Sequence, residues 1–122
     1  MNFNQYQASA HSTAVYPNEF GVIYPALKLA GEAGEVAEKI GKRIRDGRLS
    51  LVMDEVYGSR VENDMSPEQM DELVKELGDV LWYVAEIATV LNVQLDDVAQ
   101  RNIDKLHGRS LRGVLIGEGD NR

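Results

Sequence analysis

Two acidic pairs have the residue types and the spacing of a divalent-metal site. The chain reads Glu-x-x-Glu at 32–35 and Glu-x-x-Asp at 76–79. Residues three apart on a helix project from neighbouring faces, so each pair can direct two carboxylates at one point. Converging carboxylates repel one another unless a cation joins them, and Mg²⁺ or Mn²⁺ prefers such oxygen ligands. We predict four ligands: Glu32, Glu35, Glu76 and Asp79.

The same spacing also has an ordinary explanation. Acidic residues are common on exposed helix faces, and Glu-x-x-Glu arises there by chance. Both pairs lie beside apolar stripes, with Glu32 and Glu76 at the edges of those stripes on a helical wheel. Spacing alone therefore leaves two interpretations open: a metal site, or an acidic rim that is only solvated.

A set of polar and basic residues could bind phosphate. Asn102, Lys105 and Arg109 follow one another at spacings of three and four, which places them along one helix face. A lysine is a compact point charge suited to phosphate oxygens, and an asparagine can donate to a phosphate or a ribose hydroxyl. A polar outer face that forms only salt bridges is the alternative.

One tyrosine lies on the same helical strip as the second acidic pair. Tyr83 follows Glu76 and Asp79 at helical spacing, so its ring could approach a base or a water at the metal site. A purely structural role for Tyr83 and its neighbour Trp82 remains open. His11 and His107 do not have metal-ligand spacing, and the chain contains no cysteine and no P-loop.

Helical periodicity dominates the elements that must position these residues. We expect helices at about 4–13, 25–46, 66–92 and 95–107, with Ser66-Pro67-Glu68-Gln69 as a helix start and Gly108 as a terminator. Residues 48–65 have no clear period and could form a short helix, a small hairpin or a mobile loop. The Gly-rich ending should be irregular. The prediction is an all-α, four-helix-bundle-like domain spanning residues 1–122, with inward stripes that include Leu29, Ala33, Val36, Ile40, Ile44, Met70, Leu73, Val74, Leu77, Val80, Leu81, Val84, Ala88, Leu91, Leu95, Val98, Ala99, Ile103 and Leu106.

The bulk composition limits the class of partner. The 122 residues carry a formal net charge of −7, which disfavours tight binding to a nucleic-acid polymer. The chain starts without the pattern of a signal peptide, and no apolar run approaches the length of a membrane span. We therefore expect a cytoplasmic protein without a membrane partner.

Three segments together resemble the MazG-like family of all-α nucleotide pyrophosphohydrolases. They are LKLAGEAGEVAEKI at 27–40, KELGDVLWYVAEIA at 75–88 and LDDVAQRNIDKL at 95–106. The ending GVLIGEGDNR is similar to the tail of small, stand-alone members of phage type, in which case the compartment is the host cytoplasm. Residues 48–65 resemble an insertion relative to many members.

The resemblance implies roles for the residues singled out above. The four acidic residues would bind Mg²⁺, and Asn102 and Lys105 match the family's Asn-x-x-Lys, which contacts the phosphates. Arg109 and the tail residue Arg122 are weaker substrate candidates. It also implies a homodimer or homotetramer with active sites near subunit contacts.

The expected reaction is hydrolysis of a nucleoside triphosphate to the monophosphate and pyrophosphate. Water would attack the α-phosphorus while Glu35 or Glu32 accepts its proton and Lys105 stabilises the departing phosphates. A deoxynucleotide is our preference, with dGTP as the first guess. The alternatives are a non-catalytic nucleotide-sensing module and a purely structural, oligomeric interaction module.

Overall fold

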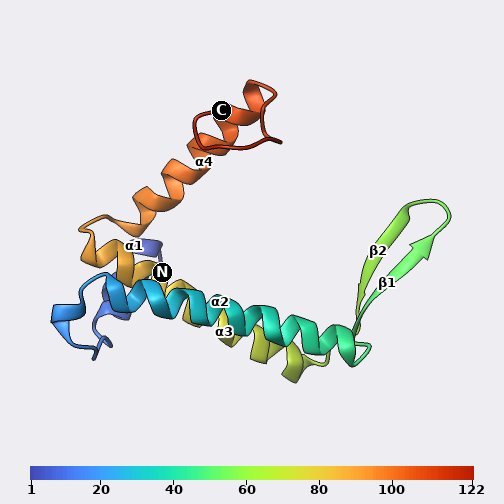
Figure 1. The fold of residues 1–122 in the computed structure, drawn as a ribbon, viewed down its shortest axis with the longest axis horizontal. Helices are drawn as coiled ribbons and strands as arrows, with labels where there is room; N and C mark the ends of the chain where they lie inside the picture. The colour runs from blue at the N-terminus through green and yellow to red at the C-terminus, as the bar shows by residue number, and fades with distance from the viewer.

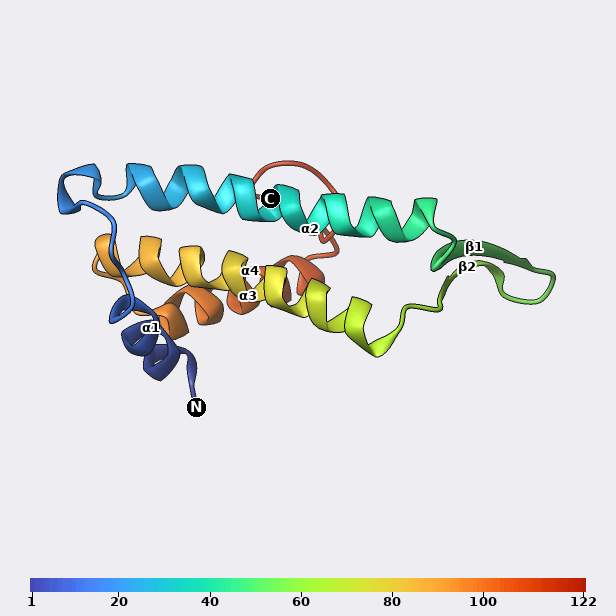
Figure 2. The same ribbon diagram turned by 90° about the horizontal axis from the view of Figure 1, so that it is seen from below.

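The computed structural model describes residues 1–122 and is mostly helical. Its elements are α1 (Phe3–His11), a 3₁₀ turn η1 (Asn18–Phe20), α2 (Ile23–Arg45), β1 (Leu49–Asp54), β2 (Gly58–Asn63), α3 (Pro67–Val90) and α4 (Leu95–Leu111). The two long helices α2 and α3 run antiparallel, side by side (Figures 1 and 2). The hairpin projects from one end of this pair, whereas α1 lies at the other end, from which α4 leads away (Figure 1). None of the helices is long and apolar enough to cross a lipid bilayer.

The capping signal before α3 is confirmed in detail. The Ser66 hydroxyl accepts from the Gln69 amide at 3.2 Å, and the Gln69 side chain accepts from the Ser66 amide at 3.0 Å. Pro67 occupies the first helical turn, where its missing N–H costs nothing because that position has no intrahelical acceptor. The start of the helix that carries Glu76 and Asp79 is therefore fixed by local sequence.

The predicted end of the last helix is wrong by one turn. Gly108 lies inside α4, which continues to Leu111. Gly113, with a φ of 70°, follows the helix in the left-handed conformation that commonly terminates helices. The turn beyond Gly108 contains Arg109, which is buried.

The prediction of an all-α fold is wrong for residues 49–63, where the hairpin interpretation is confirmed. β1 and β2 pair antiparallel, with Leu49 opposite Asn63 and Leu51 opposite Val61. Leu49, Leu51 and Met53 lie on one face of β1, and Val52 lies on the other. The Asp54 carboxylate closes the turn by accepting from the amides of Val56 and Tyr57.

Helix α1 caps the start of α4 through side chains. Gln94 at the N-cap of α4 provides no side-chain cap. Instead, Gln7 accepts from the Leu95 amide at 2.8 Å, and Asn4 accepts from the Asp96 amide at 3.0 Å. These are first-turn N–H groups that have no intrahelical partner, so α1 and the start of α4 are joined by a tertiary cap.

The predicted apolar stripes are only partly covered in one chain. On α2, Leu29 and Val36 are half-buried, whereas Ala33, Ile40 and Ile44 are exposed. The buried core is small and consists of Ala10, Ala85, Ala88 and Leu95. The exposed members of the α3 and α4 stripes are Met70, Val74, Leu77, Leu91, Val98 and Ile103. These stripes are wider than the contact between α2 and α3, so one edge of each remains open.

Candidate active site

Three of the four predicted acidic ligands meet where α2 packs on α3. Glu32 from α2 and Glu76 and Asp79 from α3 each offer a carboxylate oxygen, and these oxygens lie within 4.8 Å of one another. Glu32 and Glu76 are half-buried, and Asp79 is exposed. Ligands of a single hard cation lie roughly 2.0–2.6 Å from it, so oxygens this close can share one ion.

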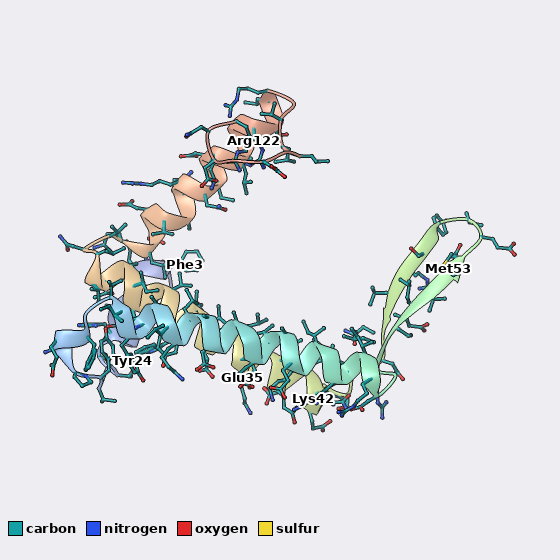
Figure 3. The ribbon with its side chains drawn as sticks, viewed as in Figure 1. Phe3, Tyr24, Glu35, Lys42, Met53 and Arg122 are labelled. Atoms are coloured by element: carbon teal, nitrogen blue, oxygen red, sulfur yellow. The ribbon has the colours of Figure 1, made fainter.

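The fourth predicted ligand is not part of this group. Glu35 lies one turn beyond Glu32 in the middle of α2, and its side chain is exposed (Figure 3). The structure therefore brings one member of the first acidic pair and both members of the second pair together.

Two lysines that the sequence analysis did not single out neutralise part of the acidic group. Lys28 Nζ lies 3.5 Å from a Glu32 oxygen on the same helix, and Lys39 Nζ lies 3.4 Å from a Glu76 oxygen across the helix pair. A signal existed for Lys28, because it precedes Glu32 by four residues. Lys39 needed knowledge of how α2 packs on α3.

A pocket of about 370 Å³ adjoins the acidic group. Glu32 and Asp79 form part of its lining, so carboxylates and an aromatic wall share one space. The other lining residues are Thr13, Val15, Tyr16, Tyr24, Trp82 and Tyr83. Such a pocket can accommodate a flat, apolar ring beside a group that needs a cation.

The aromatic rings of the pocket pack against one another. Tyr16 and Tyr24 are stacked with their centroids 4.9 Å apart, and Trp82 meets Tyr83 edge to face at 4.8 Å. Burial raises the pKa of Tyr83 to about 12, aided by the nearby Tyr24 and by the negative charges of Glu32 and Asp79. Tyr83 is therefore a neutral phenol at physiological pH.

The segment after α1 is anchored to α3 at two points. The Trp82 indole N–H donates to the Thr13 hydroxyl at 2.9 Å. The Tyr16 hydroxyl donates at 2.7 Å to Glu86, a carboxylate that is 1% exposed and that also lies 3.0 Å from His11 Nδ1. Burial, together with this hydrogen bond and the charge of Glu86, raises the pKa of Tyr16 to about 12. These contacts fix the wall of the pocket.

Sequence reasoning selected Tyr83 from this wall and did not select Tyr16, Tyr24 or Thr13. The latter three come from the segment between α1 and α2 and from the first turn of α2, where no helical period relates them to Asp79. Only the aromatic content of residues 16–24 could have pointed to the two tyrosines, and no sequence signal marks Thr13.

The predicted phosphate-binding residues lie on α4, away from the acidic group in a single chain. Asn102 and Lys105 line a hollow of about 350 Å³ together with Arg101. Arg109 is buried near the end of the helix. Arg122, in the tail, donates to the Val114 carbonyl at 3.0 Å and lies well away from Glu35 (Figure 3).

Comparisons with known proteins identify the family of this chain. The sequence matches the MazG nucleotide pyrophosphohydrolase domain over residues 25–113, a range that contains all four acidic candidates and Asn102, Lys105 and Arg109. It is also 41% identical over 128 residues to the Gene 37 protein of Mycobacterium phage L5, and the match covers the whole of both chains. No solved structure matches it. The chain belongs to the MazG nucleotide pyrophosphohydrolase family.

Proposed function

We propose that this protein hydrolyses a nucleoside triphosphate to the monophosphate and pyrophosphate in the presence of Mg²⁺. One observation carries the proposal: the pocket with the aromatic wall is also lined by Glu32 and Asp79 of the acidic group. A nucleotide needs both parts, because its base stacks on aromatic rings while its phosphates need cations.

The residues present fit a hard divalent cation. The group consists only of carboxylates from Glu32, Glu76 and Asp79, without sulfur or imidazole. When bound, Mg²⁺ neutralises phosphate charge and makes water a better nucleophile near neutral pH. Mn²⁺ has similar ligand preferences and is an alternative.

Glu35 is the residue we assign as proton acceptor. It lies one turn from Glu32, yet its exposed carboxylate is outside the close acidic group and is free to act as a base. Water attacks the α-phosphorus, its proton passes to Glu35, and the bond from that phosphorus to the bridging oxygen breaks, which releases pyrophosphate. We assign the same role to Glu32 if Glu35 is instead recruited by the metal.

The remaining polar residues would hold the substrate. Lys105 and Arg109 supply positive charge for the β- and γ-phosphates, and Asn102 adds a neutral donor on the same helix. Tyr83 contributes to the wall against which the base packs. We propose a deoxynucleotide, with dGTP as the first substrate to test, because the chain resembles small phage-type members.

We further propose that the active form is a homodimer or homotetramer. One chain exposes 8,881 Å², whereas a compact protein of 13.6 kDa exposes about 6,600 Å². The difference, about 2,300 Å², exceeds the ~800 Å² per partner of a standard interface. The open apolar edge of α2 and the exposed Leu51 and Val61 on the hairpin are surfaces that a second copy can cover.

A second copy also offers a way to complete the site. Asn102 and Lys105 lie apart from the acidic group in one chain because α4 leads away from the helix pair (Figure 1). Association can place α4 of one copy near the acidic group of another. Light scattering coupled to gel filtration should therefore give a mass of two or four chains, and a monomer that is fully active would contradict this part of the proposal.

The reaction is tested with a panel of ribo- and deoxynucleoside triphosphates. With Mg²⁺ present, we expect monophosphate and pyrophosphate from one or a few of them, resolved by chromatography. Diphosphate with orthophosphate would mean that a different bond is cut. No turnover would favour the nucleotide-sensing or structural module.

Glu35→Gln provides the sharper test of the mechanism. A lost general base lowers kcat by roughly 10²- to 10⁴-fold, and we expect this with little change in Mg²⁺ binding. Glu38→Gln is the matched control, because Glu38 is exposed on the same helix and pairs only with Lys42. Near-normal turnover in Glu35→Gln would contradict the assignment.

A further inference from the structure

Asp120, in the C-terminal tail, forms salt bridges with Lys105 and Arg109 of α4. Asp120 Oδ1 lies 3.1 Å from Arg109 Nη2 and 3.4 Å from Lys105 Nζ. The Asp120 side chain is exposed to solvent, whereas the Arg109 side chain is only 5% exposed. The guanidinium and the ammonium group hold the pKa of Asp120 below its usual range, so this carboxylate stays ionised.

The tail satisfies the buried arginine incompletely. Arg109 Nη2 donates to both the Gly119 carbonyl and Asp120, each at 3.1 Å. The Arg109 Nε is buried and has no hydrogen-bond partner. A buried, unpaired donor on a charged group is costly, so the tail does not fully satisfy the hydrogen-bonding capacity of this guanidinium.

The tail is held in this position by its own end. Arg122 donates from Nε to the Val114 carbonyl at 3.0 Å and also reaches the Gly119 carbonyl. Arg112, at the C-cap of α4, in turn donates to the Arg122 carbonyl at 2.8 Å. Residues 114–122 thus fold back on the end of α4 and present Asp120 to Lys105 and Arg109.

We propose that Asp120 is an internal competitor for the phosphate-binding cations of α4, so that the tail must be displaced when a phosphoanhydride anion binds. The inference rests on the proposed function, because that function assigns Lys105 and Arg109 to the phosphates. A carboxylate offers two oxygens, whereas pyrophosphate offers many and can engage Lys105, Arg109 and Asn102 together. The apparent affinity for the anion is the intrinsic affinity multiplied by the fraction of time that the tail leaves the site open.

Titration calorimetry with inorganic pyrophosphate tests the competition. EDTA is included so that no metal can draw the anion to Glu32, Glu76 and Asp79. We expect Asp120→Asn to bind pyrophosphate about fivefold more tightly than the unchanged protein, which is the typical strength of one exposed ion pair. Asp104→Asn is the matched control: it removes the same charge beside Lys105, yet Asp104 bonds only to Gln100.

The double variant Lys105→Gln with Asp120→Asn separates competition from general charge. If Asp120 competes for Lys105, the gain from Asp120→Asn shrinks when Lys105 is already absent. Equal pyrophosphate affinity in Asp120→Asn and the unchanged protein would overturn the proposal and leave the tail contact as structural only. An equal gain in Asp104→Asn would also overturn it, since the effect would then be one of net charge.

Turnover measured alongside keeps the two proposals apart. Tighter pyrophosphate binding in Asp120→Asn without any nucleotide hydrolysis in either protein would support the competitor and contradict the enzyme. Hydrolysis in both proteins with unchanged pyrophosphate affinity would support the enzyme and contradict the competitor.

Discussion

The phenol of Tyr16 donates a 2.7 Å hydrogen bond to Glu86, a carboxylate that is almost completely buried. Glu86 lies about two turns beyond Asp79 on α3, and it has no part in the proposed chemistry. Its role is to hold the segment after α1 against α3, and thereby one wall of the pocket beside Glu32 and Asp79. The tyrosine is retained as a neutral donor, which makes this contact sensitive to alkaline pH.

The stability of the protein should fall between about pH 10 and pH 12 partly because of Tyr16. Its pKa is raised to about 12 from 10.0, so the folded state holds the phenolic proton more tightly than the unfolded chain. The contribution is complete below pH 10 and is lost as the pH rises through 12. Tyr16→Phe should show a shallower decline in the free energy of unfolding over this range. Urea unfolding at a series of pH values measures it, with the exposed Tyr57→Phe as control; equal declines in Tyr16→Phe and the unchanged protein would contradict the prediction.

Removing the cap that α1 supplies to α4 should destabilise the whole chain. Gln7 accepts from the Leu95 amide and donates to the Val93 carbonyl, so Gln7→Ala leaves two backbone groups without their partner. A buried unsatisfied group costs about 1–3 kcal/mol, and we expect that loss in urea unfolding. Gln100→Ala, on the exposed face of α4, should change the free energy of unfolding by no more than about 0.5 kcal/mol. Similar losses in the two variants would mean that the cap contributes nothing.

Magnesium should stabilise the folded protein through the acidic group. At ten times its Kd, a ligand that binds only the folded state contributes about 1.4 kcal/mol, which appears as a rise in Tm. Asp79→Asn should reduce this rise strongly, because Asp79 is one of the three close carboxylates. Glu72→Gln on the same helix, whose partner is Arg43, should keep it. If Asp79→Asn keeps the full magnesium shift, the ion binds elsewhere.

Truncating the aromatic wall should weaken substrate binding more than it slows the reaction. Stacking of a base on an aromatic side chain is worth roughly 1–3 kcal/mol, so Trp82→Ala should raise KM about tenfold or more. Because Trp82 offers neither a metal ligand nor a proton acceptor, we expect kcat to change much less. Trp82→Phe, which keeps a stacking surface but not the bond to Thr13, should fall in between. A large loss of kcat at unchanged KM would contradict a binding role.

Much of the helical scaffold could be predicted, because it depends on patterns among residues that are close in sequence. Ser66 and Gln69 form a capping signal that predicts the start of α3. The positions of Glu32, Glu76 and Asp79 beside the apolar stripes indicate that these three residues lie along one rim of the helix pair. These features depend on contacts within a turn or on a single helix–helix seam. The hairpin is harder to predict from the sequence. The consecutive apolar residues Leu51, Val52 and Met53 interrupt the alternation expected of a strand, so a short helix is equally compatible with the sequence of this segment.

The rest depends on contacts between residues distant in sequence. Nothing around Gln7 indicates that it will cap Leu95, and nothing around Glu86 indicates that it will hold Tyr16. The apolar stripes also predict burial, whereas Ile40 and Ile44 are exposed in one chain. A periodic pattern shows that a face is apolar, but it does not show whether the same chain or another copy covers it.

The way the hairpin joins the two long helices has a consequence for how this sequence can change. Its base is closed by Leu49 opposite Asn63 and by the Asp64 amide donating to the Arg48 carbonyl at 2.7 Å. The paired base of the hairpin therefore holds the end of α2 and the start of α3 together, whatever the length of the hairpin beyond that base. Insertions, deletions or a peptide tag near Val56 should leave the separation of Glu32 and Glu76 unaltered. The tip of the hairpin is thus a place where the chain can change in length without altering the packing of α2 on α3.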